Sequence, residues 1–87
     1  MGVARVQGPL PGPKSKALIE RRSKAVAGGV SLAHPLFLER ASGAVLTDVD
    51  GNSFIDFCGG IGCMNVAHAR PEVIAAAPAS AQRVTHA

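Results

Sequence analysis

The sequence predicts a small α+β fold: an N-terminal helix, a three-stranded antiparallel meander, a glycine-rich loop and a C-terminal helix. Three observations predict this fold. A run of helix-forming residues between Ser15 and Ala27 ends at two glycines. Three short apolar runs separated by turn residues follow, and Pro71 stands where the first turn of a second helix is expected.

The length and composition of the chain limit the core that such a fold can form. It has 87 residues, of which 47% are hydrophobic but only 3% aromatic. Alanine and valine, which bury little area per residue, supply much of the hydrophobic content. A chain of this size buries only about 60% of the surface that its unfolded form exposes. We therefore expect one domain at most, without a sizeable core of its own.

The first element is expected to be a helix that follows an irregular segment. Residues 1–13 are rich in glycine and proline, which break helices and strands, so they are expected to form a flexible lead-in. Ser15 is a residue type that often caps a helix N-terminus, and the helix is expected to run from there to Ala27. Residues 14–87 then make up the folded part.

The middle of the chain predicts the meander. Residues Ser42-Gly43 form the first expected turn. Asp50-Gly51 forms the second, because Asp-Gly between two apolar runs is typical of a two-residue hairpin turn in which both central residues have positive φ. The three expected strands span residues 36–40, 44–49 and 53–57.

A glycine-rich loop and a second helix are expected to complete the fold. Three of the four residues in 59–62 are glycines, which disfavour regular structure, and the loop is expected to extend to His68. A helix is expected from Pro71. Pro78 should kink or stop this helix, because proline lacks the backbone N–H and clashes with the preceding turn.

Two patterns resemble binding sites without completing one. Asp48, Asp50 and Asn52 have the spacing that opens a calcium-binding loop, but Ser53 and Gly59 stand where its glycine and bidentate acid belong. A turn therefore explains the three residues better. Two cysteines, at positions 58 and 63, lack a second pair for a zinc site, so we expect two reduced thiols.

No complete catalytic apparatus is visible in the sequence. The histidines, at positions 34, 68 and 86, are far apart and have no ligand partners at metal-binding spacing, so each is expected on the surface or as a loop anchor. The lysines at positions 14, 16 and 24 all fall on the first helix, outside any apolar pattern that would suit Schiff-base chemistry.

The charge distribution suggests a second hypothesis. The net charge is +3, and six of the basic residues precede residue 25. The alternative prediction is a small basic binding module that uses the Lys14–Lys24 helix on an acidic partner or nucleic acid. The lack of stacking aromatic residues in this segment argues against nucleic acid. No apolar run approaches the length of a membrane span, and nothing indicates secretion, so a cytoplasmic protein is expected.

One ordered set of residues resembles a known family. The upstream part contains Gly12-Pro13-Lys14-Ser15 and Ala33-His34-Pro35, and the later part contains the motifs Asp50-Gly51-Asn52, Phe54-Ile55-Asp56, Gly59-Gly60-Ile61-Gly62, Asn65 and His68 through Pro71. Over residues 12–87 this string is similar to the N-terminal part of class III pyridoxal-phosphate-dependent aminotransferases, and within them to the 4-aminobutyrate aminotransferases. Where the family usually has Gly-His-x-His-Pro, this chain has Ala67-His68-Ala69-Arg70-Pro71.

The resemblance implies a piece of a fold-type I enzyme that is inactive alone. In that family this region is part of the small domain, packs on the remainder of the chain, and belongs to a homodimer. Gly60, Ile61 and Gly62 would line the substrate side of the site as substrate-binding residues. Catalytic and cofactor-binding residues would lie elsewhere, so this chain alone is expected to bind no pyridoxal phosphate. The complete enzyme would move an amino group from a donor such as 4-aminobutyrate to 2-oxoglutarate, with pyridoxal phosphate as cofactor.

Overall fold

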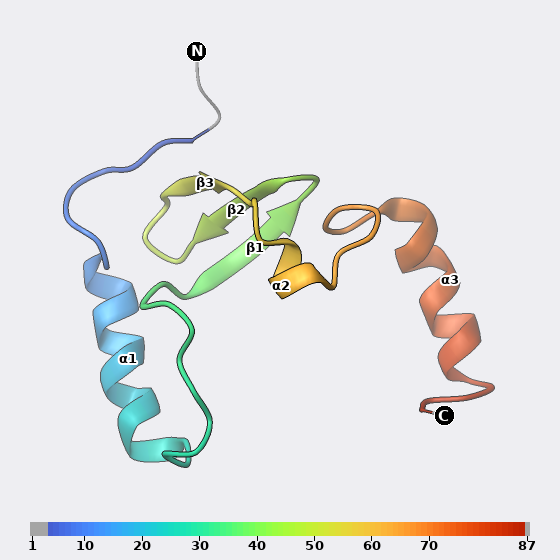
Figure 1. The fold of residues 1–87 in the computed structure, drawn as a ribbon, viewed down its shortest axis with the longest axis horizontal. Coiled ribbons are helices and arrows are strands. Elements are labelled where there is room, and N and C mark those ends of the chain that lie inside the picture. Colours follow the sequence, from blue (N-terminus) through green and yellow to red (C-terminus); the bar gives the residue numbers. More distant parts are fainter. Residues whose placement is uncertain (1–3, 87) are drawn as a thin grey trace.

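The fold consists of a helix, a three-stranded sheet, a short turn and a second long helix (Figure 1). A computed structural model describes residues 4–86; the first three residues of the predicted lead-in, and Ala87, lie outside the described residues. The elements are α1 (Pro13–Ala25), β1 (Leu38–Ser42), β2 (Val45–Asp48), β3 (Ser53–Ile55), α2 (Gly59–Gly62) and α3 (Pro71–Ala81). The predicted α+β fold is thus confirmed.

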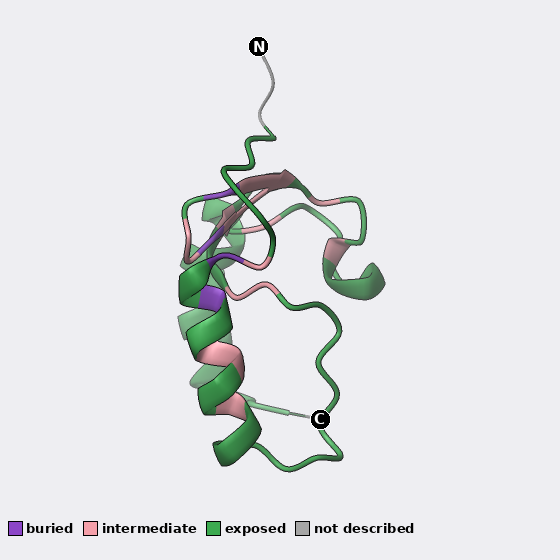
Figure 2. Cartoon of the chain, turned by 90° about the vertical axis from the view of Figure 1, so that its left-hand side faces the viewer, coloured by how far each residue is buried: buried purple, intermediate pink, exposed green. Residues whose placement is uncertain are grey.

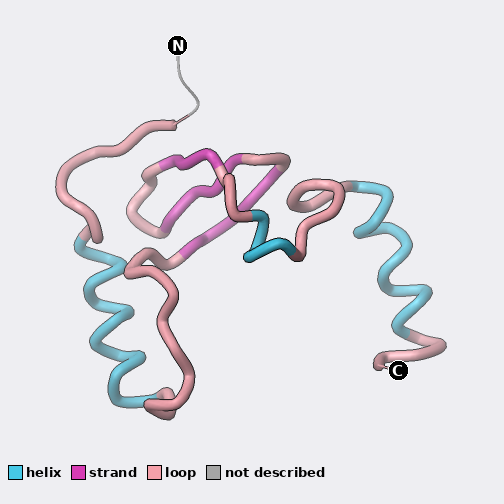
Figure 3. The backbone as a smooth tube through the Cα atoms, viewed as in Figure 1, coloured by secondary structure: helices cyan, strands magenta, loops and turns pink. Residues whose placement is uncertain are grey.

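The sheet is the expected antiparallel meander, with strand order β1-β2-β3 (Figure 3). Strand β1 begins and ends two residues later than predicted, whereas β2 and β3 are shorter than predicted. Because Ser42 pairs with Val45, the first turn consists of Gly43 and Ala44 and not of Ser42-Gly43. In β1 the register shifts between Leu38 and Arg40, where one extra residue makes a bulge.

The second turn is longer than predicted. The backbone N–H of Asp48 donates to the Asn52 carbonyl (3.0 Å), and the N–H of Gly51 donates to the Asp48 carbonyl (3.1 Å). Gly51 has a φ of 86°, whereas Asp50 is not among the residues with positive φ. This is a three-residue loop with glycine in the left-handed position, a common alternative to the two-residue turn.

Helix α1 begins two residues before the predicted Ser15 and ends two residues before Ala27. Pro13 occupies the first turn, where its missing N–H costs no hydrogen bond. The N–H groups of Lys14 and Ser15 donate to the two carboxylate oxygens of Asp50 (2.8 and 2.9 Å), so the hairpin turn caps this helix.

Helix α3 begins at Pro71 as predicted. Of the two outcomes expected at Pro78, a kink or a stop, the stop does not occur. The helix continues through Pro78 to Ala81. Proline removes one hydrogen bond, to the carbonyl four residues earlier, which here is that of Ile74. All residues of α3 are exposed, so water can satisfy this carbonyl.

The elements form an open arrangement without an apolar core. Among residues 4–86 no hydrophobic side chain is buried, which confirms the expected lack of a core. The radius of gyration is 15.5 Å, against about 12 Å for a compact domain of this length. Figure 2 shows buried residues only at the junction of α1 with the hairpin. Within the described chain, each helix is too short or too polar to span a bilayer.

The buried centre of the fold is polar. We call Gly12, Ser15, Asp48 and Asn52 the polar junction, and all four are buried. The Asp48 carboxylate accepts the Asn52 backbone and side-chain N–H groups (2.8 and 2.9 Å), and Asn52 Oδ1 accepts the N–H of Gln7 (2.7 Å). The predicted lead-in therefore makes defined contacts with the hairpin.

Candidate functional site

The glycine-rich loop forms one tight left-handed turn. Gly59, Gly60, Ile61 and Gly62 have consecutive φ values of 56°, 64°, 58° and 80°. The N–H of Gly62 donates to the Cys58 carbonyl (2.9 Å), which closes the turn. The expectation of no regular structure in this segment is wrong. Glycine disfavours a right-handed helix but adopts the left-handed conformation without steric cost, so the short element α2 is compatible with the three glycines.

Ile61 is the exception within this turn. It is a β-branched residue at a φ of 58°, a conformation in which such residues are rare outliers. Its side chain is not buried, since Ile61 is 83% exposed. Strained backbone of this kind persists where the surroundings hold it, and it is frequent at ligand-binding sites. The turn therefore presents one apolar side chain and several accessible backbone groups.

Asp56 holds the start of the loop. One carboxylate oxygen, Oδ1, accepts the backbone N–H groups of Cys58 (2.9 Å) and Gly59 (2.8 Å). The other, Oδ2, lies 2.5 Å from Nε2 of His68. Because an ionised carboxylate only accepts hydrogen bonds, Nε2 of the histidine is the donor. The His68 hydrogen bond, followed by that from Gly59, lowers the pKa of Asp56 below its ordinary value, although burial acts in the opposite direction.

His68 holds the end of the same loop. Its backbone N–H and carbonyl form a reciprocal pair with those of Gly43 (2.9 and 3.0 Å), in the turn between β1 and β2. The expected loop-anchoring histidine is confirmed here. The role of Asp56 was missed, although an aspartate two residues before a loop N–H is a known turn signal that could have suggested it. We call these two residues the Asp56–His68 clasp.

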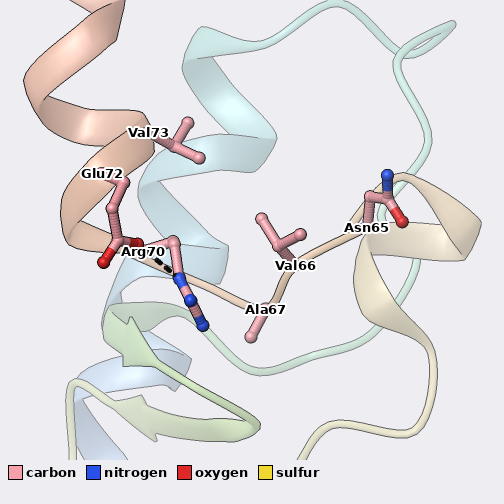
Figure 4. Close-up of a pocket in the computed structure, with 6 residues that line it drawn as sticks. All are labelled: Asn65, Val66, Ala67, Arg70, Glu72 and Val73. Atoms are coloured by element: carbon pink, nitrogen blue, oxygen red, sulfur yellow. Dashed lines mark hydrogen bonds and ion pairs between the residues drawn. The ribbon is translucent and has the colours of Figure 1, made fainter.

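An open hollow lies between the loop and the start of α3 (Figure 4). It has a volume of about 610 Å³. Arg70 Nε donates to a carboxylate oxygen of Glu72 (2.5 Å), and both side chains are largely exposed. The lining residues are Asn65, Val66, Ala67, Arg70, Glu72 and Val73. The predicted substrate-binding residues are thus not among those that line this hollow.

The lysine and cysteine side chains in the described part of the chain are all exposed. Lys14, Lys16 and Lys24 are exposed on α1, which does not fit the desolvated setting of a cofactor-bound lysine. Cys58 and Cys63 are free and exposed, as expected. No cluster of three or more metal-ligating residues exists within residues 4–86.

The aspartates of the calcium-like pattern act in the fold itself. Asp48 lies in the polar junction, and Asp50 caps α1. Burial would raise the pKa of Asp50, but hydrogen bonds from the backbone N–H groups of Ser15 and Lys14 outweigh it and lower this pKa. The turn interpretation is therefore confirmed.

Comparison with known proteins finds relatives that are transaminases. It is 40% identical over 72 residues to the 4-aminobutyrate aminotransferase of Escherichia coli strain K12, a match that covers 83% of this chain and 17% of that enzyme. It is 39% identical over 72 residues to the 5-aminovalerate aminotransferase of Pseudomonas putida, and this match also covers 83% of this chain and 17% of the enzyme. A solved transaminase with pyridoxal phosphate bound superposes with a TM-score of 0.69 at 34% identity, over 82% of this chain and 18% of the other.

The family match agrees with these relatives. The aminotransferase class-III family matches residues 25–87. This finding does not favour the alternative of a free-standing basic module. The chain spans about 17% of the length of the curated relatives that it matches. The chain belongs to the class III aminotransferase family.

Proposed function

We propose that residues 14–87 supply the N-terminal segment of a pyridoxal-phosphate-dependent aminotransferase, with Gly60, Ile61 and Gly62 on the substrate side of its active site. The observation that carries this proposal is the left-handed turn, which presents Ile61 and accessible backbone from a loop held at both ends. An apolar side chain and close backbone approach suit the aliphatic part of a small amino acid.

The proposed donor is an ω-amino acid of the 4-aminobutyrate type, and the proposed acceptor is 2-oxoglutarate. The names of the E. coli and P. putida relatives specify 4-aminobutyrate and 5-aminovalerate, two amino acids that carry the amino group at the end of an aliphatic chain. Both relatives match this chain to nearly the same extent. The comparison therefore supports the class of ω-amino acids but does not favour one of the two substrates over the other.

The cofactor and partners follow from the same proposal. None of the three lysines in the described chain fits a cofactor-bound lysine, so we assign the pyridoxal phosphate site to the remainder of a complete enzyme. The segment would pack on that remainder within a homodimer in the cytoplasm. The segment alone is proposed to be inactive.

A chimeric enzyme tests the proposal. In this chimera, residues 12–87 replace the matching segment of the E. coli 4-aminobutyrate aminotransferase. We expect it to transfer amino groups from 4-aminobutyrate to 2-oxoglutarate. Ile61→Asp should raise the KM for 4-aminobutyrate at least about tenfold, because a carboxylate at this position repels the substrate carboxylate; a factor of ten corresponds to about 1.4 kcal/mol.

Val30→Asp is the matched control, since Val30 is another exposed β-branched residue, 57% exposed and outside the loop. It should leave KM unchanged. An unchanged KM in Ile61→Asp would remove Ile61 from the substrate site. A folded, cofactor-loaded chimera that accepts other amino acids but not 4-aminobutyrate or 5-aminovalerate would refute the donor class.

A further inference from the structure

We propose that the Asp56–His68 clasp sets the affinity for the amino donor by holding the Gly60–Gly62 turn in its binding conformation. The inference rests on the proposed function of that turn. It assigns a positioning role to two residues that do not themselves contact substrate. The supporting observation is that the Asp56 carboxylate forms hydrogen bonds to both ends of the loop.

The clasp closes the loop with a single side chain. Residues 57–67 leave the end of β3 and return at His68, and Asp56 bonds to both ends of this path. Its carboxylate uses Oδ1 for the outgoing backbone and Oδ2 for the returning histidine. A loop closed at its base has far fewer conformations than an open one, so the bonds restrict the turn between them.

The clasp is shielded, whereas the turn is not. The side chain of Asp56 is only 7% exposed and that of His68 20%, compared with 83% for Ile61. A hydrogen bond between shielded, oppositely polarised groups is stronger than the same bond in water. The loop therefore combines a fixed base with an accessible turn.

The clasp is also attached to the sheet. The reciprocal backbone pair between His68 and Gly43 connects it to the β1–β2 turn, and Asp56 donates its own N–H to the Ala44 carbonyl (2.8 Å). Both members are thereby fixed to the same end of the hairpin. Loss of the side-chain bond would leave these backbone bonds in place but release the turn.

Release of the turn should appear in KM and not in kcat. If only a fraction of molecules hold the turn in its binding conformation, the apparent dissociation constant rises by the inverse of that fraction. In the chimera, His68→Ala should raise the KM for 4-aminobutyrate about five- to tenfold with kcat within twofold. His68→Gln should restore most of the affinity, because its side-chain N–H can replace Nε2–H.

Two further measurements test whether a rise in KM is due to release of the turn. Amide hydrogen exchange at Cys58 and Gly59 should accelerate in His68→Ala and recover in His68→Gln, a readout independent of catalysis. His34→Ala, the matched histidine control outside the loop, should change neither KM nor exchange. If His68→Ala does not fold, His68→Phe tests the same bond, since its ring keeps much of the bulk of the imidazole but has no N–H.

The outcomes distinguish this proposal from the one on which it rests. If Ile61→Asp raises KM but His68→Ala, or His68→Phe in its place, changes neither KM nor exchange, the clasp proposal is wrong and the function of the turn stands. If loss of the clasp lowers kcat with KM unchanged, the positioning role is also refuted. If Ile61→Asp has no effect, the turn does not bind substrate and both proposals fail.

Discussion

Within residues 4–86, three residues with side chains adopt left-handed backbone, and they mark the segment where local strain concentrates. Ile61, Ala67 and Ala69 have φ values of 58°, 71° and 54°. The two alanines flank His68, whose backbone pairs with Gly43 and whose ring bonds to Asp56. Tertiary bonds made by His68 thus hold its neighbours in a conformation that glycine would adopt at less cost.

Ala67→Gly is accordingly expected to stabilise the segment by up to about 1 kcal/mol. The left-handed conformation costs alanine roughly 1–2 kcal/mol, and the greater entropy of glycine in the unfolded chain offsets part of the gain from removing this cost. In the chimera, exchange of the His68 amide, which donates to the Gly43 carbonyl, should slow about fivefold. Ala44→Gly, at a residue without positive φ, should not slow it. Faster exchange in Ala67→Gly would show that φ at this position is not strained.

Asp56 makes the loop sensitive to acid. Its pKa is lowered in the folded state relative to about 3.9 in the unfolded chain, so the folded state binds fewer protons. The stabilisation is complete above the unfolded pKa and is lost as pH falls through the lowered folded value. Protection of the Gly59 amide, corrected for intrinsic exchange, should therefore decline below about pH 4. In Asp56→Asn this decline should disappear; an equal decline in that variant would assign the effect to other groups.

At the scale of elements, the polar junction takes the place that an apolar core has in most folds. Asn52 is 1% exposed and bonds to Asp48 and to the backbone of Gln7. The Ser15 hydroxyl accepts the N–H of Phe37 (3.2 Å). Gly12 is required on steric grounds, because a Cβ there would lie 2.4 Å from the Asp50 carboxylate carbon. Helix α1, the hairpin and residues 4–12, which we call the N-terminal arm, meet through these bonds.

Asn52→Ala should separate these elements at a cost of about 1–3 kcal/mol, because it leaves buried partners without hydrogen bonds. The expected result is faster exchange of the Gln7 amide in the chimera, which donates to Asn52 Oδ1. Asn65→Ala, at an exposed loop asparagine, is the matched control and should have no effect on that amide. Equal exchange in the two variants would mean that the junction does not hold the arm.

Helix α3 contains a defect that a single substitution can repair. Pro78→Ala restores an N–H that can donate to the Ile74 carbonyl, and removes a penalty of up to about 3 kcal/mol. Amides in the second half of α3 should then exchange more slowly. Ala77→Gly, which adds a flexible residue next to the same site, should speed exchange instead. If Pro78→Ala left exchange unchanged, packing on the rest of the enzyme would already determine the stability of this helix.

At the scale of the whole molecule, local patterns predicted the elements but not the bonds that join them. The meander and the start of α3 at Pro71 follow from alternation, turn residues and a first-turn proline, all of which act between near neighbours. The start of α1 was predicted wrongly because its cap is Asp50, 36 residues from Lys14. The pairing of Asp56 with His68 was missed for the same reason: its two partners meet only after the chain has folded.

The missing apolar core leads to the last prediction. Hydrophobic burial is the main driving force of folding, yet no hydrophobic side chain in residues 4–86 is buried, and large ones such as Phe57 (93% exposed) face outward. Hydrogen bonds at the polar junction contribute only about 1 kcal/mol each, too little to offset the conformational entropy of the ordered residues. The isolated chain should therefore melt gradually by circular dichroism, without a sigmoidal transition.

Addition of the E. coli 4-aminobutyrate aminotransferase lacking its matching segment should change this behaviour. The chain superposes on part of a solved transaminase, and under the proposed function its exposed apolar side chains would pack on the remainder of such an enzyme. Burial gains roughly 25 cal/mol per Å² of apolar surface, which would make unfolding cooperative and shift it to higher temperature. A sharp transition of the chain alone, unaffected by the truncated enzyme, would show instead that the polar junction and the sheet are sufficient for a stable fold.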